Sequence, residues 1–184
     1  MATTALFVEL LVIGVGSAAW VTLAVMTVLG YTWVRVDLVT SLPGLIPVLA
    51  ALYVLGIIVD RLADRLFQPT ADHLLARSFS TREEYERARV LVYSHSSLID
   101  LIEYNRSRLR VCRGWVVNCA ATLLAFGGFV WVQAPPQWPR PKLLAVGTAV
   151  LTLVGAGAFH AWYRLTVDSF QRLSQQATFL REGK

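Results

Sequence analysis

Charged residues are distributed unevenly along this chain, and long apolar runs lie between them. The four apolar runs cover residues 5–30, 42–59, 115–134 and 143–161, and the one Asp, Glu, Lys or Arg inside them is Glu9. A helix needs roughly 20 apolar residues to cross the hydrocarbon core of a bilayer, which is about 30 Å thick. The pattern therefore predicts an all-α integral membrane protein with four transmembrane helices.

Composition supports this fold class. Of the 184 residues, 55% are hydrophobic and 16% are charged, whereas soluble domains average roughly 45–50% apolar and about 25% charged residues. A water-soluble enzyme, a disordered tail and a disulfide scaffold are therefore not expected. A cleaved signal peptide is not expected either, because residues 1–6 lack the positive charge that precedes such a segment.

The basic residues predict the orientation of the spans. Arg35 lies between the first two runs, and Arg140 and Lys142 lie between the last two, while all other lysines and arginines flank the opposite ends. Positively charged flanks remain in the cytoplasm. We therefore expect a multi-pass protein of the plasma (inner) membrane with both termini in the cytoplasm.

Residues 60–113 form the only sizeable polar stretch, and we expect them to fold as a helical cytoplasmic stalk between spans two and three. The chain then divides into four segments: a first transmembrane hairpin (1–59), the cytoplasmic helical segment (60–113), a second transmembrane hairpin (114–164) and a cytoplasmic C-terminal tail (165–184).

Local signals predict the helices of the stalk. Helical spacing continues beyond the second apolar run until Pro69, where we expect that helix to end. Ser80 and Thr81 are each followed three residues later by a glutamate, which predicts a capping box at the start of the next helix. Because neither proline nor glycine occurs between Thr81 and Arg113, we expect this helix to run directly into the third span.

This second stalk helix is expected to dock a partner. Apolar residues recur at intervals of three and four along residues 85–109, and a second apolar stripe lies beside them. A helix that is apolar on two sides packs against more than one neighbour. We assign the docking of another subunit or a cytosolic protein to Glu84, Tyr85, Val92, Ile99, Ile102 and Glu103.

Three polar residues within or near the apolar runs are candidate pore or polar membrane sites. Glu9 lies near the start of span one, where it can reach cytoplasmic water or form a ring at a pore mouth. Asn118 in span three is expected to seek a hydrogen-bond partner on another helix, which favours bundling or oligomerisation. His160, one turn from the inner end of span four, is a candidate pH sensor or an interfacial polar residue.

Small residues predict where helix backbones approach each other, within one chain or between subunits. These residues are Gly14, Ser17 and Ala18 in span one, Gly127 and Gly128 in span three, and Gly147, Ala156 and Gly157 in span four.

A basic cluster precedes the third span and is expected to contact anionic lipid headgroups. It consists of Arg106, Arg108, Arg110 and Arg113. Direct contact with nucleic acid is the weaker interpretation, because acidic residues lie close by and no aromatic stacking pattern accompanies the arginines.

Two carboxylates at the end of span two offer the one enzymatic hypothesis. Gly56, Asp60 and Asp64 are spaced as in the second half of the metal-binding motif of CDP-alcohol phosphatidyltransferases, which this segment resembles. The resemblance implies a divalent cation at the inner membrane face. The first half of that motif is missing from residues 35–55, and an arginine-paired helix end explains the same residues.

No catalytic residue, cofactor site or metal site is assigned. Cys112 and Cys119 are too far apart on one helix for a disulfide, and no histidine or third cysteine accompanies them at metal-binding spacing.

The sequence therefore leaves three functional hypotheses. The first is a non-enzymatic, homo-oligomeric membrane scaffold that binds a cytosolic protein through its stalk. The second is an oligomeric ion-conducting pore gated through the stalk, and the third is a lipid-headgroup transferase that uses Asp60 and Asp64. The topology is similar to that of stator and energiser subunits of ion-driven machines. It also resembles the small membrane subunits of anti-phage defence systems, so membership of a defence or signalling complex is expected.

Overall fold

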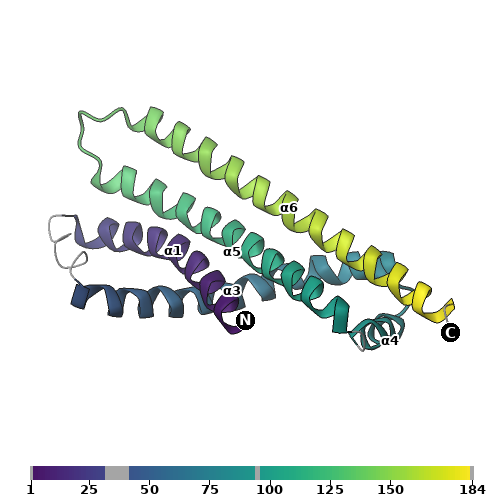
Figure 1. Ribbon diagram of the computed structural model, residues 1–184. Coiled ribbons are helices and arrows are strands. Elements are labelled where there is room, and N and C mark those ends of the chain that lie inside the picture. The colour runs from purple at the N-terminus through teal and green to yellow at the C-terminus, as the bar shows by residue number, and fades with distance from the viewer. Residues whose placement is uncertain (1, 32–41, 94–95, 183–184) are drawn as a thin grey trace.

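The structure is a computed structural model that describes residues 2–31, 42–93 and 96–182, and Arg35 lies outside these ranges. Within them the chain is all-helical, with helices α1 (Ala2–Leu29), α3 (Leu42–Ser78), α4 (Arg82–Tyr93), α5 (Ser96–Gln133) and α6 (Arg140–Glu182) (Figure 1). All of them except α4 are long and apolar enough to cross a membrane. This confirms the all-α fold and the long apolar helices predicted from the sequence.

Helix α5 is central to the packing and contacts each of the other four helices. Helix α1 packs between α3 and α5, and α6 packs along the other side of α5. The α5–α6 turn lies at the same end of the molecule as the C-terminal end of α1 and the start of α3 (Figure 1). Helix α4 and the C-terminus lie at the opposite end, which we call the polar end. It comprises residues 60–93, 96–113 and 164–182.

Two glycines bring α1 and α3 into backbone contact. A Cβ atom on Gly14 would overlap the carbonyl oxygen of Leu52, and a Cβ atom on Gly56 would overlap the carbonyl oxygen of Leu10. No side chain fits at either position without separating the helices. Gly14 is thus a close-packing position within the chain, as its small size predicts.

Three other glycines that the sequence singles out differ in their surroundings. Gly147 faces the ring of Phe126 on α5, so it also marks a close contact within the chain. Gly127 and Gly157 are equally small, but apart from the neighbouring part of its own helix, a Cβ atom at either position would have no described atom within 4 Å. Glycine content alone therefore does not separate the contact positions from the open ones.

Helix α3 does not end at Pro69, contrary to the prediction from the sequence. It continues through this proline to Ser78. Proline removes one backbone donor and disfavours the helix interior, but Pro69 lies on the exposed side of α3. The side chains on either side of it pack within the protein. The ring of Phe67 lies edge-on to that of Trp162, with 4.6 Å between the ring centroids, and Leu74 is buried. Tertiary packing therefore outweighs the local preference of the proline.

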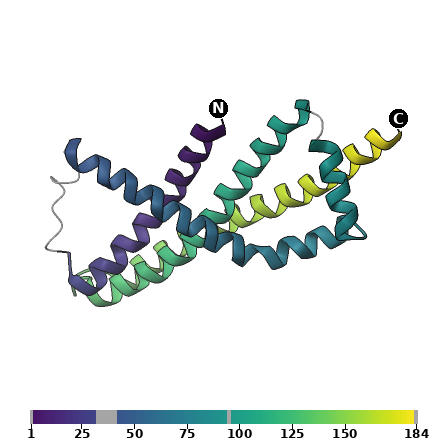
Figure 2. The same cartoon turned by 90° about the horizontal axis from the view of Figure 1, so that it is seen from below.

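The expected continuous helix from Thr81 into the third span is also wrong. Helix α4 ends at Tyr93 and α5 begins at Ser96. Helix α4 packs against α6 and lies across the polar end (Figure 2). Its buried residues Ala88 and Val92 form a small core with Phe79 and Ala177. A straight helix cannot both lie across α6 in this way and continue along α5, so α4 and α5 are separate helices.

The predicted capping box at the start of α4 is present. The Glu84 backbone N–H donates to the Thr81 hydroxyl oxygen (3.1 Å), and the Ser80 backbone N–H donates to the Glu84 carboxylate (3.1 Å). The first bond satisfies a donor that the first turn of a helix leaves without an intrahelical partner, and the second holds the backbone N–H of the residue before the cap.

Candidate functional site

An ion-pair network joins α1, α3 and α5 where the polar end begins. Arg110 donates to the Glu9 carboxylate at 2.9 Å, and its Nε lies 3.6 Å from Asp60. Arg113 donates to Asp60 at 3.1 Å and also to Asp64. Each guanidinium group therefore bridges two carboxylates, and Asp60 is shared by both arginines.

Most of this network is shielded from solvent. The exposed fractions are 11% for the Glu9 side chain and 13% for Asp60, whereas Asp64 is 54% exposed. Fully exposed ion pairs contribute little, about 0–1 kcal/mol, but partly buried pairs with charge-assisted hydrogen bonds contribute more. Three carboxylates face two guanidinium groups, so the network carries one excess negative charge. The network holds α1, α3 and α5 together where the polar end begins.

Asp60 and Asp64 share a face of α3, as their spacing predicts, and Arg113 binds both. Arg61 is an i,i+3 neighbour of Asp64 on α3, but the arginine that binds Asp60 and Asp64 in the structure comes from α5. In the described part of the chain, no group of three or more His, Cys, Asp or Glu side chains is placed to hold a metal ion.

Asn118 forms a second polar cluster, between α5 and α1. Its Nδ2 donates to the Ile13 carbonyl oxygen at 2.8 Å, and its Oδ1 accepts from Trp20 at 3.2 Å. The Ser17 hydroxyl lies within hydrogen-bond distance of Asn118 Oδ1 (3.0 Å) and of the Ile13 carbonyl. Asn118 is 2% exposed, and the interhelical hydrogen bond predicted for it is present within the chain.

His160 lies on α6 and is exposed. Glu9, Asn118 and His160 therefore occupy three different environments. The first is ion-paired, the second is buried and hydrogen-bonded, and the third lies on an open helix face.

The residues assigned to partner docking are divided in the same way. Val92 is completely buried and Tyr85 is half-buried beside Phe79 and Phe170. Glu84 caps α4, and Glu103 is exposed. Ile99 and Ile102 belong to a stretch of α5 whose side chains lie outside the described part of the structure.

The four arginines of the basic cluster have two kinds of partner. Arg110 and Arg113 bind carboxylates of this chain. The guanidinium groups of Arg106 and Arg108 instead lie over the rings of Tyr93 and Tyr104, at 5.6 and 5.5 Å from the ring centroids. Neither of these two arginines forms an ion pair with a carboxylate that the structure describes.

The pairing of Glu9 with Arg110 was not predicted from the sequence, because 101 residues separate them. A signal for it exists. Glu9 is the lone carboxylate near the start of the first apolar run, and Arg110 lies just before the third run, so the two residues are level when these helices run parallel.

Comparisons of this sequence and structure with protein families, curated proteins and solved structures find no match.

Proposed function

We propose that this protein is a non-enzymatic scaffold of the inner membrane that assembles as a homo-oligomer and docks a cytosolic protein on its polar end. In this proposal α1, α3, α5 and α6 cross the membrane, both termini are cytoplasmic, and the polar end is the cytoplasmic stalk. The stalk would serve as the membrane subunit of a defence or signalling complex.

The observation that carries the proposal is the separate packing of the polar end. Phe79, Ala88, Val92 and Ala177 form a buried core outside the apolar runs. Tyr85, Leu91, Phe170, Leu173 and Leu180 pack around that core. A membrane anchor does not require a folded unit of this kind, whereas a docking platform does, because a rigid surface loses less conformational entropy on binding.

The polar end also presents side chains for a partner. Val90 on α4 is 70% exposed and Phe179 on α6 is 76% exposed, and both lie on helices that pack together. The acidic side chain of Glu103 on α5 is exposed as well. Aromatic and apolar residues within a polar surround are the usual centre of a protein interface.

Oligomer formation is supported by the packing of α6. Its apolar half packs along α5, and its outward residues Val146, Val150 and Leu153 are between 53% and 73% exposed. The outward face is open to lipid or to a second copy of the chain. We assign it to the subunit interface, where close van der Waals packing drives association of helices in lipid.

The ion-pair network connects the polar end to three helices. Because Arg110 and Arg113 hold α1, α3 and α5 together at the base of the polar end, a partner docked there would be connected to all three of them.

The same contacts favour the scaffold over the other two hypotheses. Glu9 and Asn118, proposed for an ion pathway, are both engaged by partners inside the chain. Asp60 and Asp64, proposed for a transferase, are both bound by Arg113.

Two variants on the polar end test the docking. Val90→Lys and Glu103→Lys change exposed side chains on α4 and α5, and Trp138→Lys in the α5–α6 turn is the control at the opposite end. Each tagged variant is purified gently from its native cells, and co-purifying proteins are quantified by mass spectrometry. We expect the polar-end variants to lose a soluble protein that wild type and Trp138→Lys retain. Equal retention by all variants would contradict the proposal.

A further inference from the structure

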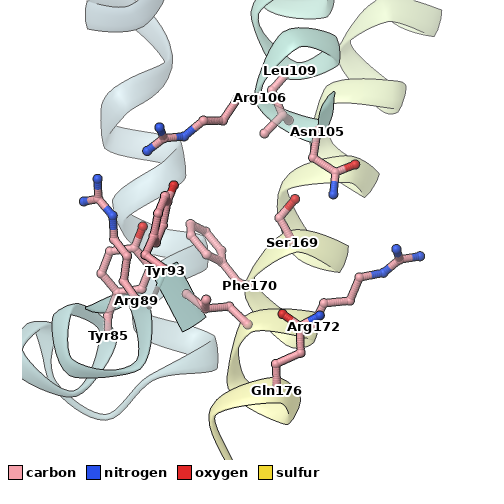
Figure 3. A pocket seen from close by; sticks show the side chains of 11 residues that line it. Tyr85, Arg89, Tyr93, Asn105, Arg106, Leu109, Ser169, Phe170, Arg172 and Gln176 are labelled. Carbon is pink, nitrogen blue, oxygen red and sulfur yellow. The ribbon is translucent and has the colours of Figure 1, made fainter. Parts of the chain in front are cut away.

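A cavity lies within the polar end, between α4, α5 and α6 (Figure 3). Its volume is about 170 Å³, which is smaller than the roughly 300 Å³ of the smallest drug-sized sites. The cavity therefore suits a compact polar group rather than a whole nucleotide.

The cavity is lined by three arginines, Arg89, Arg106 and Arg172, and no carboxylate is among its lining residues. Arg89 forms an ion pair with Glu86 at 3.7 Å, on the exposed side of α4. Arg106 and Arg172 form no ion pair with a described carboxylate. Asp168 lines the adjoining groove, where Arg172 is also present. Among the described residues, the cavity lining thus has three cationic side chains and no carboxylate, and Glu86 outside the lining pairs with one of the three.

Two of the arginines converge on one ring. The guanidinium groups of Arg89 and Arg106 lie 5.5 and 5.6 Å from the centroid of the Tyr93 ring. Figure 3 shows both groups near the hydroxyl ends of Tyr85 and Tyr93, with Arg172 on the opposite side of the cavity. Like charges repel, so the pair is most stable when an anion lies between or beside them.

Neutral donors also line the cavity. Burial raises the pKa of Tyr85, although the Arg89 guanidinium acts in the opposite direction, so the phenol remains protonated and can donate. Asn105 and Gln176 add amide groups to the cavity wall. Arginine N–H groups match the geometry of phosphate oxygens and bind them in a bidentate manner.

We propose that this cavity binds a phosphate group, carried either by an anionic phospholipid headgroup or by a small soluble phosphate ester. Arg106 lies seven residues before Arg113, which is about 10 Å along the helix. At that height above the apolar runs, both the headgroup layer and the cytosol can supply the ligand. This site is additional to partner docking and does not depend on it.

The test uses the full chain in nanodiscs of phosphatidylcholine, with unfolding followed by tryptophan fluorescence at constant ionic strength. One arm adds phosphatidic acid to the bilayer, and the other adds glycerol 3-phosphate to the buffer. We expect at least one probe to raise the unfolding temperature in a saturable manner. Stabilisation by the lipid alone identifies a headgroup site, and stabilisation by glycerol 3-phosphate alone identifies a soluble ester. Stabilisation by neither probe overturns the proposal.

Variants link the binding to the cavity. The double variant Arg89→Gln/Arg106→Gln should weaken binding at least about tenfold, because charge-assisted hydrogen bonds to phosphate are lost. Arg87→Gln is the matched control, since Arg87 lies on the same helix but outside the cavity. Gln176→Glu adds a negative charge to the cavity wall and leaves both arginines on Tyr93 in place. It should therefore weaken phosphate binding, and it provides a second test if the double variant folds poorly. Unchanged affinity in Gln176→Glu and in a folded double variant would overturn the assignment.

Discussion

The amide nitrogen of Asn118 in α5 donates to the backbone carbonyl oxygen of Ile13 in α1, and the two atoms are 2.8 Å apart. Gly16 in α1 leaves room for this contact, because a Cβ atom there would lie 2.5 Å from Asn118 Nδ2. The pair of helices is thus joined by a side chain that is buried and has three hydrogen-bond partners nearby.

Replacing Asn118 should show how much its hydrogen bonds contribute to the free energy of unfolding. Asn118→Leu removes the bonds to Ile13, Ser17 and Trp20, and we expect it to lower the free energy of unfolding by about 1–2 kcal/mol. Thr152→Val, an exposed change on α6, is the control and should have no measurable effect. Both are measured by denaturant titration in detergent. Equal stability of Asn118→Leu and the control would show that the cluster does not stabilise the bundle.

The crossing of α1 and α3 predicts a difference between two chemically identical substitutions. Gly56→Ala places a Cβ atom on the carbonyl oxygen of Leu10, whereas Gly127→Ala meets no atom of a described residue within 4 Å. Overpacking of this kind costs about 1–3 kcal/mol. We expect Gly56→Ala to lower the unfolding temperature clearly and Gly127→Ala to leave it unchanged, in detergent and at one protein concentration. The reverse ranking would contradict the crossing geometry.

The ion-pair network predicts non-additive effects. Arg113→Gln leaves Asp60 with a single cation and Asp64 without its partner from α5, so it should lower stability by about 1–3 kcal/mol. In the cycle of Asp60→Asn with Arg113→Gln, the double variant should lose less than the sum of the single variants. Arg108→Gln, whose guanidinium group lies over Tyr104, is the control. Additive losses would show that Asp60 and Arg113 do not interact.

Topology is testable by labelling of single cysteines. In a variant in which alanine replaces Cys112 and Cys119, Gln137→Cys lies in the α5–α6 turn and Glu83→Cys lies on α4. We expect a membrane-impermeant maleimide to label Gln137→Cys on intact spheroplasts and Glu83→Cys only after lysis. Labelling in the opposite order would invert the orientation predicted by the basic residues.

The long helices follow from the sequence because a run of some 20 apolar residues is a local property that needs no partner. The capping box at Thr81 and Glu84 is local as well. The break between Tyr93 and Ser96 and the passage of α3 through Pro69 depend on what the flanking residues pack against. Contacts of that kind lie many residues away along the chain, so local signals do not contain them.

The sequence predicts which polar residues belong to the candidate site, but it does not predict which of them pair with each other. Glu9, Asp60, Asp64 and Asn118 each stand out as polar groups in or beside apolar runs. That Arg110 joins Glu9 to Asp60 depends on the relative height of three helices. Hydropathy places these residues at a similar height, but which helices lie side by side depends on contacts between distant parts of the chain.

The most direct test of the scaffold is the mass of the protein extracted from its native cells into lipid nanodiscs, determined together with whatever accompanies it. The account predicts a homo-oligomer with a soluble protein bound in constant proportion, and loss of that protein from Val90→Lys without a change in subunit number. A monomer without a partner would contradict both oligomer formation through α6 and docking on the polar end.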